Sequence, residues 1–323
     1  MIACGDVVLR SKTTGRPMVA PTRCKQQFTF PKGVIFMLTK QEFQAKIAAG
    51  LRIMDGATGS NLRAMGMPKG CSTEAWVLEH PDILQNLQRQ YAEAGSQIIY
   101  APSFQAQPIA LNTLGLDADT EKINAKLVAI TRQAVPGCLV AGDITTLATF
   151  CDSWDPNNFD LLVANYRRQI RGLIDGGVDI LGAETLLYPQ EAEAILTAAE
   201  LEGAGAVTYT FTMQSDGCLF SGIPAGPVLR ELALGGAAAV GFNCVCADCL
   251  TPGLVSLLRR YVKIPLICKP NAGMPTIGAD GIAHYDMSPA EFAAVIQDCA
   301  KMGATLLGGC CGTTPAHIAA ICL

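Results

Sequence analysis

The stretch "VDILGAET", residues 178–185, shows the pattern that decides the fold. A continuous apolar run ends in a polar corner that carries Glu184, and a helical stretch follows it. Apolar runs that are continuous rather than alternating are typical of parallel strands buried on both faces. Residues 178–185 therefore predict a buried strand with a polar side chain at its carboxyl end.

Similar runs recur from residue 50 onward, each followed by a glycine-rich or polar corner and then by a helical segment. They are "LRIMDG" (51–56), "QIIYAPS" (97–103), "LVAGDI" (139–144), "AVTYTF" (206–211), "AAVGFNC" (238–244), "PLICKPN" (265–271) and "TLLGGCC" (305–311). With residues 178–185 they make a set of eight strand candidates that alternate with helices, which predicts a single-domain (β/α)₈ TIM barrel. A doubly wound open sheet is the alternative, and the lack of Gly-x-Gly-x-x-Gly after the first run disfavours it.

Capping signals place the helices between these runs. Thr39 and Glu42 form a capping-box pattern that predicts a helix ending near Gly50, ahead of the first strand. Proline at the first helical position and glycine after the last are typical helix limits. They predict two further helices, in residues 81–95 and 288–303.

Composition narrows the function classes. The chain has 323 residues, of which 50% are hydrophobic and 16% charged, and its net charge is −4. This balance gives no electrostatic footprint for nucleic acid and no polybasic membrane anchor. No apolar stretch approaches the roughly 20 residues that span a bilayer. The 14 cysteines are scattered apart from residues 244–249 and 310–311, and no signal segment opens the chain, so we expect a reducing cytoplasm.

The first 36 residues differ from the rest of the chain. They are basic, irregular and rich in Pro and Gly, and the helix pattern begins abruptly after Met37. We expect residues 1–36 to be an atypical extension, with Met37 as an alternative start, and residues 37–323 to form the barrel.

In a barrel of this kind the active site lies at the carboxyl ends of the strands. The residues at these positions combine carboxylates, amides, thiols and one lysine. They are Asp55, Ser103, Asp143, Glu184, Asn243, Cys244, Lys269, Asn271, Cys310 and Cys311.

The three cysteines in this set, Cys244, Cys310 and Cys311, form a candidate metal site. Strand ends at Cys244 and at Cys310 and Cys311 can converge, since only one strand separates them in a barrel. Three thiolates with an open fourth position are typical of catalytic zinc. Small buried cysteines are the alternative, and spacing alone leaves both interpretations open. Cys246 and Cys249 are expected to be accessory, although a closed four-cysteine site would make this a non-catalytic zinc or redox protein.

The chain from Met37 onward resembles the homocysteine S-methyltransferase family, and most of all the homocysteine-binding barrel of cobalamin-dependent methionine synthase. The matching motifs are "MDGATGSNL", "PDILQNLQRQYAEAGSQIIYAPSF", "GVDILGAETL", "GFNC", "KPNAGMP" and "GGCCGTTPAHI". The resemblance implies Zn²⁺ on Cys244, Cys310 and Cys311 as the catalytic centre, with homocysteine as the methyl acceptor. The segment "YAPSF" departs from the Thr-Asn-Thr-Phe-like run of many relatives, which leaves the second-strand contacts open.

The resemblance also suggests the substrate contacts. Asp55 and Glu184 would hold the α-ammonium, and the amides of Gly56 and Ala57 would receive the carboxylate. Asn243 precedes the first thiol and is expected at the substrate, while Asn271 is a candidate fourth ligand or a loop-fixing amide.

The methyl donor is expected to be a methylcorrinoid supplied in trans by a partner protein. S-methylmethionine or a betaine is the alternative donor. A Schiff-base lyase using Lys269 is a different reading of the same strand ends. His80, His284 and His317 are expected at helix ends or on the surface rather than as ligands.

Overall fold

The structure, a computed structural model, describes residues 37–248, 251–279 and 281–322. The expected extension, residues 1–36, and Cys249 lie outside the described residues. The division of the chain at residue 37 therefore stays a prediction.

Helices and parallel strands alternate along most of the chain. The strands are β1 (Ile98–Ala101), β2 (Leu139–Ile144), β3 (Ile180–Leu186), β4 (Val207–Phe211), β5 (Ala239–Cys246), β6 (Leu266–Asn271), β7 (Thr276–Ile277), β8 (Ala283–His284) and β9 (Leu306–Leu307). The α-helices are α1 (Lys40–Ala48), α2 (Gly59–Ala64), α3 (Thr73–Glu79), α4 (Pro81–Glu93), α5 (Pro108–Asn112), α6 (Thr120–Ala134), α7 (Phe159–Asp175), α8 (Pro189–Leu201), α9 (Ala225–Leu234), α10 (Thr251–Arg259), α11 (Pro289–Lys301) and α12 (Pro315–Ile321). Two 3₁₀ turns, η1 (Asp117–Asp119) and η2 (Pro156–Asn158), precede α6 and α7.

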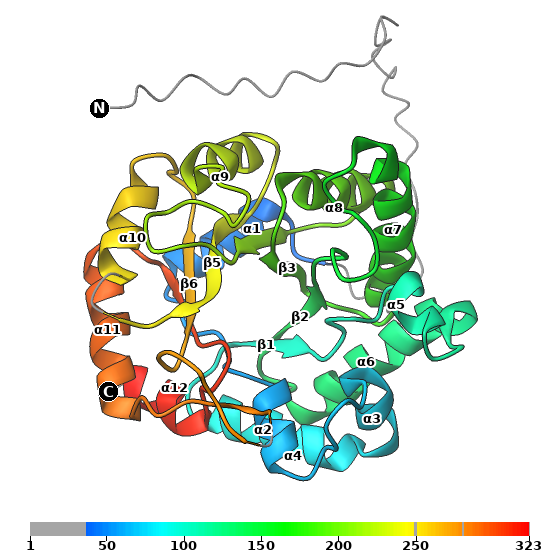
Figure 1. The fold of residues 1–323 in the computed structure, drawn as a ribbon, viewed down its shortest axis with the longest axis horizontal. Coiled ribbons are helices and arrows are strands. Elements are labelled where there is room, and N and C mark those ends of the chain that lie inside the picture. The colour runs from blue at the N-terminus through cyan, green and yellow to red at the C-terminus, as the bar shows by residue number, and fades with distance from the viewer. Residues whose placement is uncertain (1–36, 249–250, 280, 323) are drawn as a thin grey trace, which may run out of the picture. The chain divides into compact units, whose positions relative to one another are not determined.

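Within the described residues the main sheet is a curled, parallel, seven-stranded sheet in the order β1-β2-β3-β4-β5-β6-β9. Long helices surround it as an outer ring (Figure 1). The expectation of a closed eight-stranded barrel is corrected here, because the run 51–56 forms no strand. Ile53 makes a single parallel bridge to Leu307 of β9, and Met54 makes one to Ile98 of β1. The backbone of this run still bonds to both edges of the sheet, since the Met54 amide donates to the Leu307 carbonyl at 2.7 Å and the Asp55 amide donates to the Ile98 carbonyl at 3.0 Å.

The strands bury both faces, as their apolar runs predict. On β1, Ile98 and Tyr100 belong to a cluster inside the curled sheet, whereas Ile99 packs with the helices outside. This alternation follows from the two-residue repeat of a strand. Phe43 and Ile47 of α1 belong to the inner cluster, and Gln44 donates to the carbonyl of Ala238 just before β5, so α1 packs at the amino-terminal ends of the strands.

The expected helix limits are confirmed. Thr39 and Glu42 form a reciprocal capping box at the start of α1, and Ser288 caps α11 in the same way. Gly50, Gly95 and Gly303 follow their helices with positive φ angles, a conformation that other residues adopt at a cost.

A short antiparallel hairpin, β7–β8, was not expected from the sequence. Its strands are too short and too exposed to show a hydrophobic repeat. The hairpin leads into Tyr285, whose ring lies against Gly312, where a β-carbon would clash with it. The hairpin thus delivers an aromatic side chain beside the paired cysteines.

Candidate active site

The carboxyl ends of the strands enclose a cavity of about 420 Å³. Its wall contains most of the strand-end residues expected from the sequence, together with residues of the loops that follow. Among the lining residues are Asp55, Gly56, Ala57, Tyr100, Asp143, Glu184, Thr185, Cys244, Lys269, Tyr285, Cys310 and Cys311. Most of the expected strand-end residues therefore lie on one cavity, whereas Ser103, Asn243 and Asn271 do not line it.

The three cysteines come together on one wall of this cavity. The Sγ atoms of Cys244, Cys310 and Cys311 all lie within 4.8 Å of one another, and those of Cys244 and Cys311 are 3.8 Å apart. The register between β5 and β6 shifts after Asn243, and Cys244 has a φ angle of 58°. Such a bulge re-aims a side chain and is strained for a residue other than glycine.

Because the three thiols lie close together, their pKa values shift in different directions. Hydrogen bonding to Cys310 and Cys311, with burial, holds the pKa of Cys244 well above its ordinary value. Hydrogen bonds from Cys244 and Cys310 lower the pKa of Cys311 to about 3. The cluster thus favours one thiolate next to protonated neighbours.

Asn243 is fully buried behind the thiols. Its Oδ1 accepts hydrogen bonds from the Thr185 amide at 2.8 Å and the Thr210 hydroxyl at 2.9 Å. Its Nδ2 donates to the Thr185 hydroxyl at 2.7 Å and to Cys310 Sγ at 3.7 Å. Asn243 therefore positions Cys310 and the strained Thr185, whose φ angle is also 58°. Its expected contact with a substrate stays a prediction.

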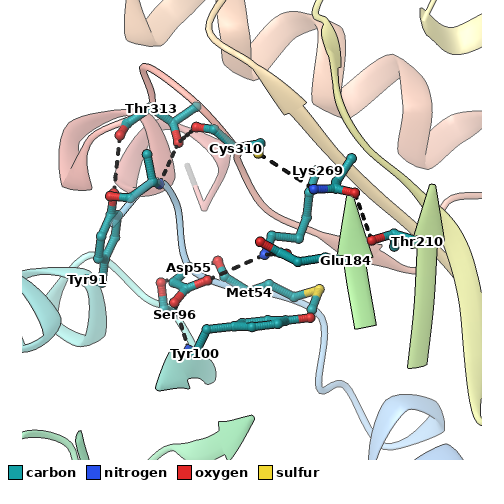
Figure 2. A network of polar contacts seen from close by, with 12 residues as sticks. Met54, Asp55, Tyr91, Ser96, Tyr100, Glu184, Thr210, Lys269, Cys310 and Thr313 are labelled. Carbon is teal, nitrogen blue, oxygen red and sulfur yellow. Dashed lines mark hydrogen bonds and ion pairs between the residues drawn. The ribbon is translucent and has the colours of Figure 1, made fainter. Parts of the chain in front are cut away.

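The same cavity contains a lysine that lies between carboxylates (Figure 2). Lys269 Nζ is 2.7 Å from Glu184 Oε2, 3.8 Å from Asp55 Oδ1 and 3.9 Å from the centre of the Tyr100 ring. Asp55 Oδ2 accepts a hydrogen bond from the Tyr100 amide at 2.8 Å. Lys269 and Asp55 are almost completely buried, so these charges interact with little screening by water.

Burial sets the protonation of this group. Burial raises the pKa of Asp55 to about 6, and Lys269 only partly opposes the shift. Burial likewise raises the pKa of Glu184 and of Asp143. For Lys269 burial acts to lower the pKa, but Glu184, Tyr100 and Asp55 outweigh it and hold the pKa well above its usual value. The lysine is therefore an ammonium, whereas a Schiff-base nucleophile needs a neutral amine.

The turn at Gly56 and Ala57 lies on the same cavity, but one of its amides is occupied. The Ala57 amide donates to Thr313 Oγ1 at 3.1 Å, and the Ala57 carbonyl accepts from the Tyr91 hydroxyl at 2.8 Å. A β-carbon at Gly56 would clash with Thr313 and Tyr91, so this position requires glycine. Of the two expected carboxylate-binding amides, only that of Gly56 remains a candidate.

Asn271 faces a second cavity of about 370 Å³, which shares Cys244 with the first. Its side chain is buried, and its Oδ1 has no hydrogen-bond partner among the described residues. Cys246 also lines this second cavity and donates to the Ala247 carbonyl at 3.7 Å. Within the described part of the chain, Cys246 is not among the thiols grouped closely enough to share a metal.

The histidines have structural roles where the structure gives their contacts. His317 bonds with Thr314 at the start of α12 and with the Met287 carbonyl. His80 stacks on Trp76 between α3 and α4, with ring centres 4.4 Å apart. His284 belongs to the edge hairpin. None of the three is in the close group of metal-binding side chains found in the described residues.

Sequence reasoning missed three residues that shape the site: Tyr100, Tyr285 and Thr313. Tyr100 lies in the "YAPSF" segment, and its inward position could have been read from its alternation with Ile99. Tyr285 and Thr313 reach the site through loops, which have no periodic signal.

The fold and this site define a class of protein: a barrel-like α/β chain with three clustered thiols beside buried carboxylates. Residues 52–323 match the family model described as homocysteine S-methyltransferase. The chain belongs to the homocysteine S-methyltransferase family, which confirms the family named from the sequence.

Individual relatives agree with this assignment. The chain is 28% identical to the homocysteine S-methyltransferase of Escherichia coli over 83% of this chain and 93% of that protein. It is also 28% identical to the methionine synthase of Mycobacterium tuberculosis over 82% of this chain, but it spans only 24% of that protein's length.

Solved structures show the same fold. The metallated form of the Escherichia coli homocysteine methyltransferase MmuM matches 86% of this chain and 98% of that chain, with 26% identity and a TM-score of 0.74. Its oxidized form matches with 27% identity and a TM-score of 0.72. Among the described residues of our chain, no helix is both long enough and apolar enough to cross a membrane.

Proposed function

We propose that this chain transfers a methyl group to the thiol of homocysteine and so forms methionine. The observation that carries the proposal is the single cavity in which three thiols face a buried group of carboxylates. A substrate that carries a thiol and an ammonium would match these two groups: its thiol would lie with the cysteines and its ammonium with the carboxylates.

The thiols fit a zinc ion. Zinc favours thiolate ligands at about 2.3 Å, and tetrahedral geometry then separates the sulfurs by about 3.8 Å. The separation of Cys244 and Cys311 is 3.8 Å. Cys244, Cys310 and Cys311 would hold the ion and leave one position open. When bound, zinc would lower the pKa of a substrate thiol, so that the thiolate is available at neutral pH.

The other residues of the cavity would bind and orient the amino acid. Asp55 and Glu184 would accept hydrogen bonds from its α-ammonium. Lys269 holds Glu184 in place through their 2.7 Å ion pair, and the Gly56 amide would receive the carboxylate. Asn243 would hold Cys310 at its position as a ligand. No side chain needs to act as a general base, because the thiol would already have lost its proton.

Our proposed donor is a methylcorrinoid carried by a partner protein. A corrinoid is larger than the cavity of about 420 Å³, so it would have to approach from the mouth. Phe220 and Met274, which are 64% and 67% exposed, offer an apolar surface on the second cavity, which shares Cys244 with the first. Exposed apolar groups of this kind are typical of interaction surfaces.

A small cationic donor such as S-methylmethionine is the second candidate, with a betaine as its variant. Two observations favour it: the acidic cavity would attract a cation, and the chain spans nearly all of the Escherichia coli enzyme. Because both donors would use the same thiol site, the acceptor assignment is independent of the donor.

An assay with purified, reduced, zinc-supplemented protein tests the proposal. Homocysteine would be offered with methylcobalamin, S-methylmethionine or glycine betaine, and methionine would be measured by mass spectrometry. We expect methionine from at least one donor and none from the Cys310→Ser variant. Methylation of another thiol without methylation of homocysteine would overturn the acceptor assignment. Activity with the sulfonium and none with the corrinoid would reverse the donor preference.

A further inference from the structure

Two strand ends that line the cavity of about 420 Å³ have the same strained backbone. Thr185 near the end of β3 and Cys244 near the end of β5 both have a φ angle of 58°, and no other non-glycine residue in the described part of the chain has a positive φ. In both strands the register with the next strand shifts at this point. A residue other than glycine keeps this conformation only where its surroundings hold it. The hydrogen bonds that hold these two bends therefore decide where their side chains point.

One side chain, that of Asn243, joins the two bends. Its Oδ1 accepts a hydrogen bond from the Thr185 amide at 2.8 Å, and its Nδ2 donates to the Thr185 hydroxyl at 2.7 Å. Asn243 directly precedes Cys244 and is fully buried, so water does not compete for these two bonds. In the sheet β4 lies between β3 and β5, so β3 and β5 do not pair with each other. The reciprocal bonds between Thr185 and Asn243 are therefore a direct link between two strands that the sheet keeps apart.

The two linked bends carry different parts of the site. Glu184, whose carboxylate lines the cavity, directly precedes Thr185 in β3. On β5 the bend directs Cys244 toward the other two thiols, and Asn243 Nδ2 also donates to Cys310 Sγ at 3.7 Å. A movement of the thiols would therefore act on Asn243, and through its two bonds to Thr185 it would act on the segment that carries Glu184.

We propose that Thr185 is a positioning residue that couples the thiol site to the carboxylate that binds the acceptor. A metal that fixes the three thiols would hold Asn243 in place, and the bonds from Asn243 to Thr185 would hold Glu184 ready for an ammonium. Coupling between two binding sites is reciprocal, so the amino acid should raise the affinity for zinc by the same factor by which zinc raises the affinity for the amino acid. The inference rests on the proposed function for the identity of the metal and of the acceptor.

The experiment measures binding of L-2-aminobutyrate, which has the ammonium and carboxylate of homocysteine but no sulfur that could reach the metal. Its affinity is measured by calorimetry in reduced protein with and without zinc. In the wild type we expect zinc to tighten binding about fivefold or more, the lower end of typical coupling between sites. Thr185→Val keeps the β-branched shape but removes the hydroxyl, and should reduce this factor to about twofold or less. Thr185→Ser keeps the hydroxyl and should restore the wild-type factor.

Thr145→Val is the matched control. Its hydroxyl donates to the Glu184 carbonyl at 2.9 Å but does not contact Asn243. The substitution should therefore change the affinity for L-2-aminobutyrate by the same factor with and without zinc. This result would separate a general weakening of the strand end from a loss of coupling between the two sites.

A zinc factor that is absent in the wild type, or unchanged in Thr185→Val, would overturn the proposal, as would a wild-type chain that binds no zinc or no L-2-aminobutyrate. A chelator titration of the wild type with and without L-2-aminobutyrate gives a second reading that needs no variant, and the amino acid should tighten zinc binding by the same factor. Equal zinc affinity in both titrations would overturn the coupling. If the chain forms no methionine with any donor but the zinc factor still falls in Thr185→Val, the proposed function fails and the coupling stands.

Discussion

Lys269 Nζ lies 2.7 Å from Glu184 Oε2 at the bottom of the cavity, and both side chains are largely withdrawn from water. Removing one partner of a buried ion pair leaves the other charge uncompensated. We expect Lys269→Met to lower the free energy of unfolding by about 3–5 kcal/mol, measured by urea denaturation. Lys122→Met, which breaks the exposed pair with Asp119, is the control and should cause no measurable change. A stable Lys269→Met protein would contradict the structural role of this pair.

Glu184→Gln separates substrate binding from metal binding. The substitution removes a charged acceptor from the cavity but leaves the three thiols untouched. Homocysteine binding should weaken by about 1.5–3 kcal/mol, the range for a charge-assisted hydrogen bond. Zinc content, measured by mass spectrometry, should not change. Loss of zinc in this variant would show instead that Glu184 helps to hold the three cysteines that bind the metal.

The proposed zinc site of Cys244, Cys310 and Cys311 can be tested by measuring metal content alone. Reduced protein should carry about one Zn²⁺ per chain, and Cys310→Ser or Cys311→Ser should lose it, since both would be ligands of a three-thiol site. Cys246→Ser is the matched control, because Cys246 lies outside the close thiol group of the described residues. Retention of zinc by the double variant Cys310→Ser and Cys311→Ser would refute the site, and loss of zinc from Cys246→Ser would extend it.

Asn243→Ala tests a residue that acts through a thiol. The side chain makes its hydrogen bonds to Thr185, Thr210 and Cys310, so the variant leaves these groups less well held. Partners of metal ligands typically contribute 10- to 100-fold to metal affinity, and we expect a loss of about that size in a competitive chelator titration. Thr210→Val, which removes only the hydroxyl that Asn243 Oδ1 accepts from, should lose less. Equal zinc affinity in Asn243→Ala and wild type would contradict this positioning role.

Asp55 should make stability depend on pH. Burial raises its pKa from 3.8 to about 6, so the folded state keeps a proton that the unfolded chain has released. Stability from this group is therefore complete below pH about 4 and is lost as the pH rises through about 6. Relative to Asp55→Asn, the wild-type free energy of unfolding should fall by about 2.4 kcal/mol between pH 4 and 7. A constant difference between the two proteins would show that the carboxylate titrates normally.

Much of the fold could be predicted from local patterns. The apolar runs predicted the sheet strands β1 to β6 and β9, because a strand buried on both faces needs an uninterrupted apolar sequence. The caps at Thr39 and Ser288 were predictable because they depend on residues only a few positions apart. The run 51–56 was wrong as a strand, since it meets each edge of the sheet through a single bridge rather than through a ladder. Whether residues 51–56 pair with β1 and β9 through a ladder or through single bridges depends on contacts between segments far apart in the chain. No pattern within a short stretch of sequence predicts such contacts.

The sequence by itself determined which chemical groups stand at the strand ends, because parallel strands carry all their carboxyl ends to one edge. It thereby determined that Cys244, Cys310 and Cys311 share a site with Asp55 and Glu184. Only the tertiary structure decided how these groups pair. It turned Asn243 behind the thiols and set Lys269 between two carboxylates. It also left Oδ1 of Asp143 without a hydrogen-bond partner among the residues that the structure describes. The reason is physical: side-chain direction at a bulge and the balance of buried charges depend on contacts between residues far apart in the chain.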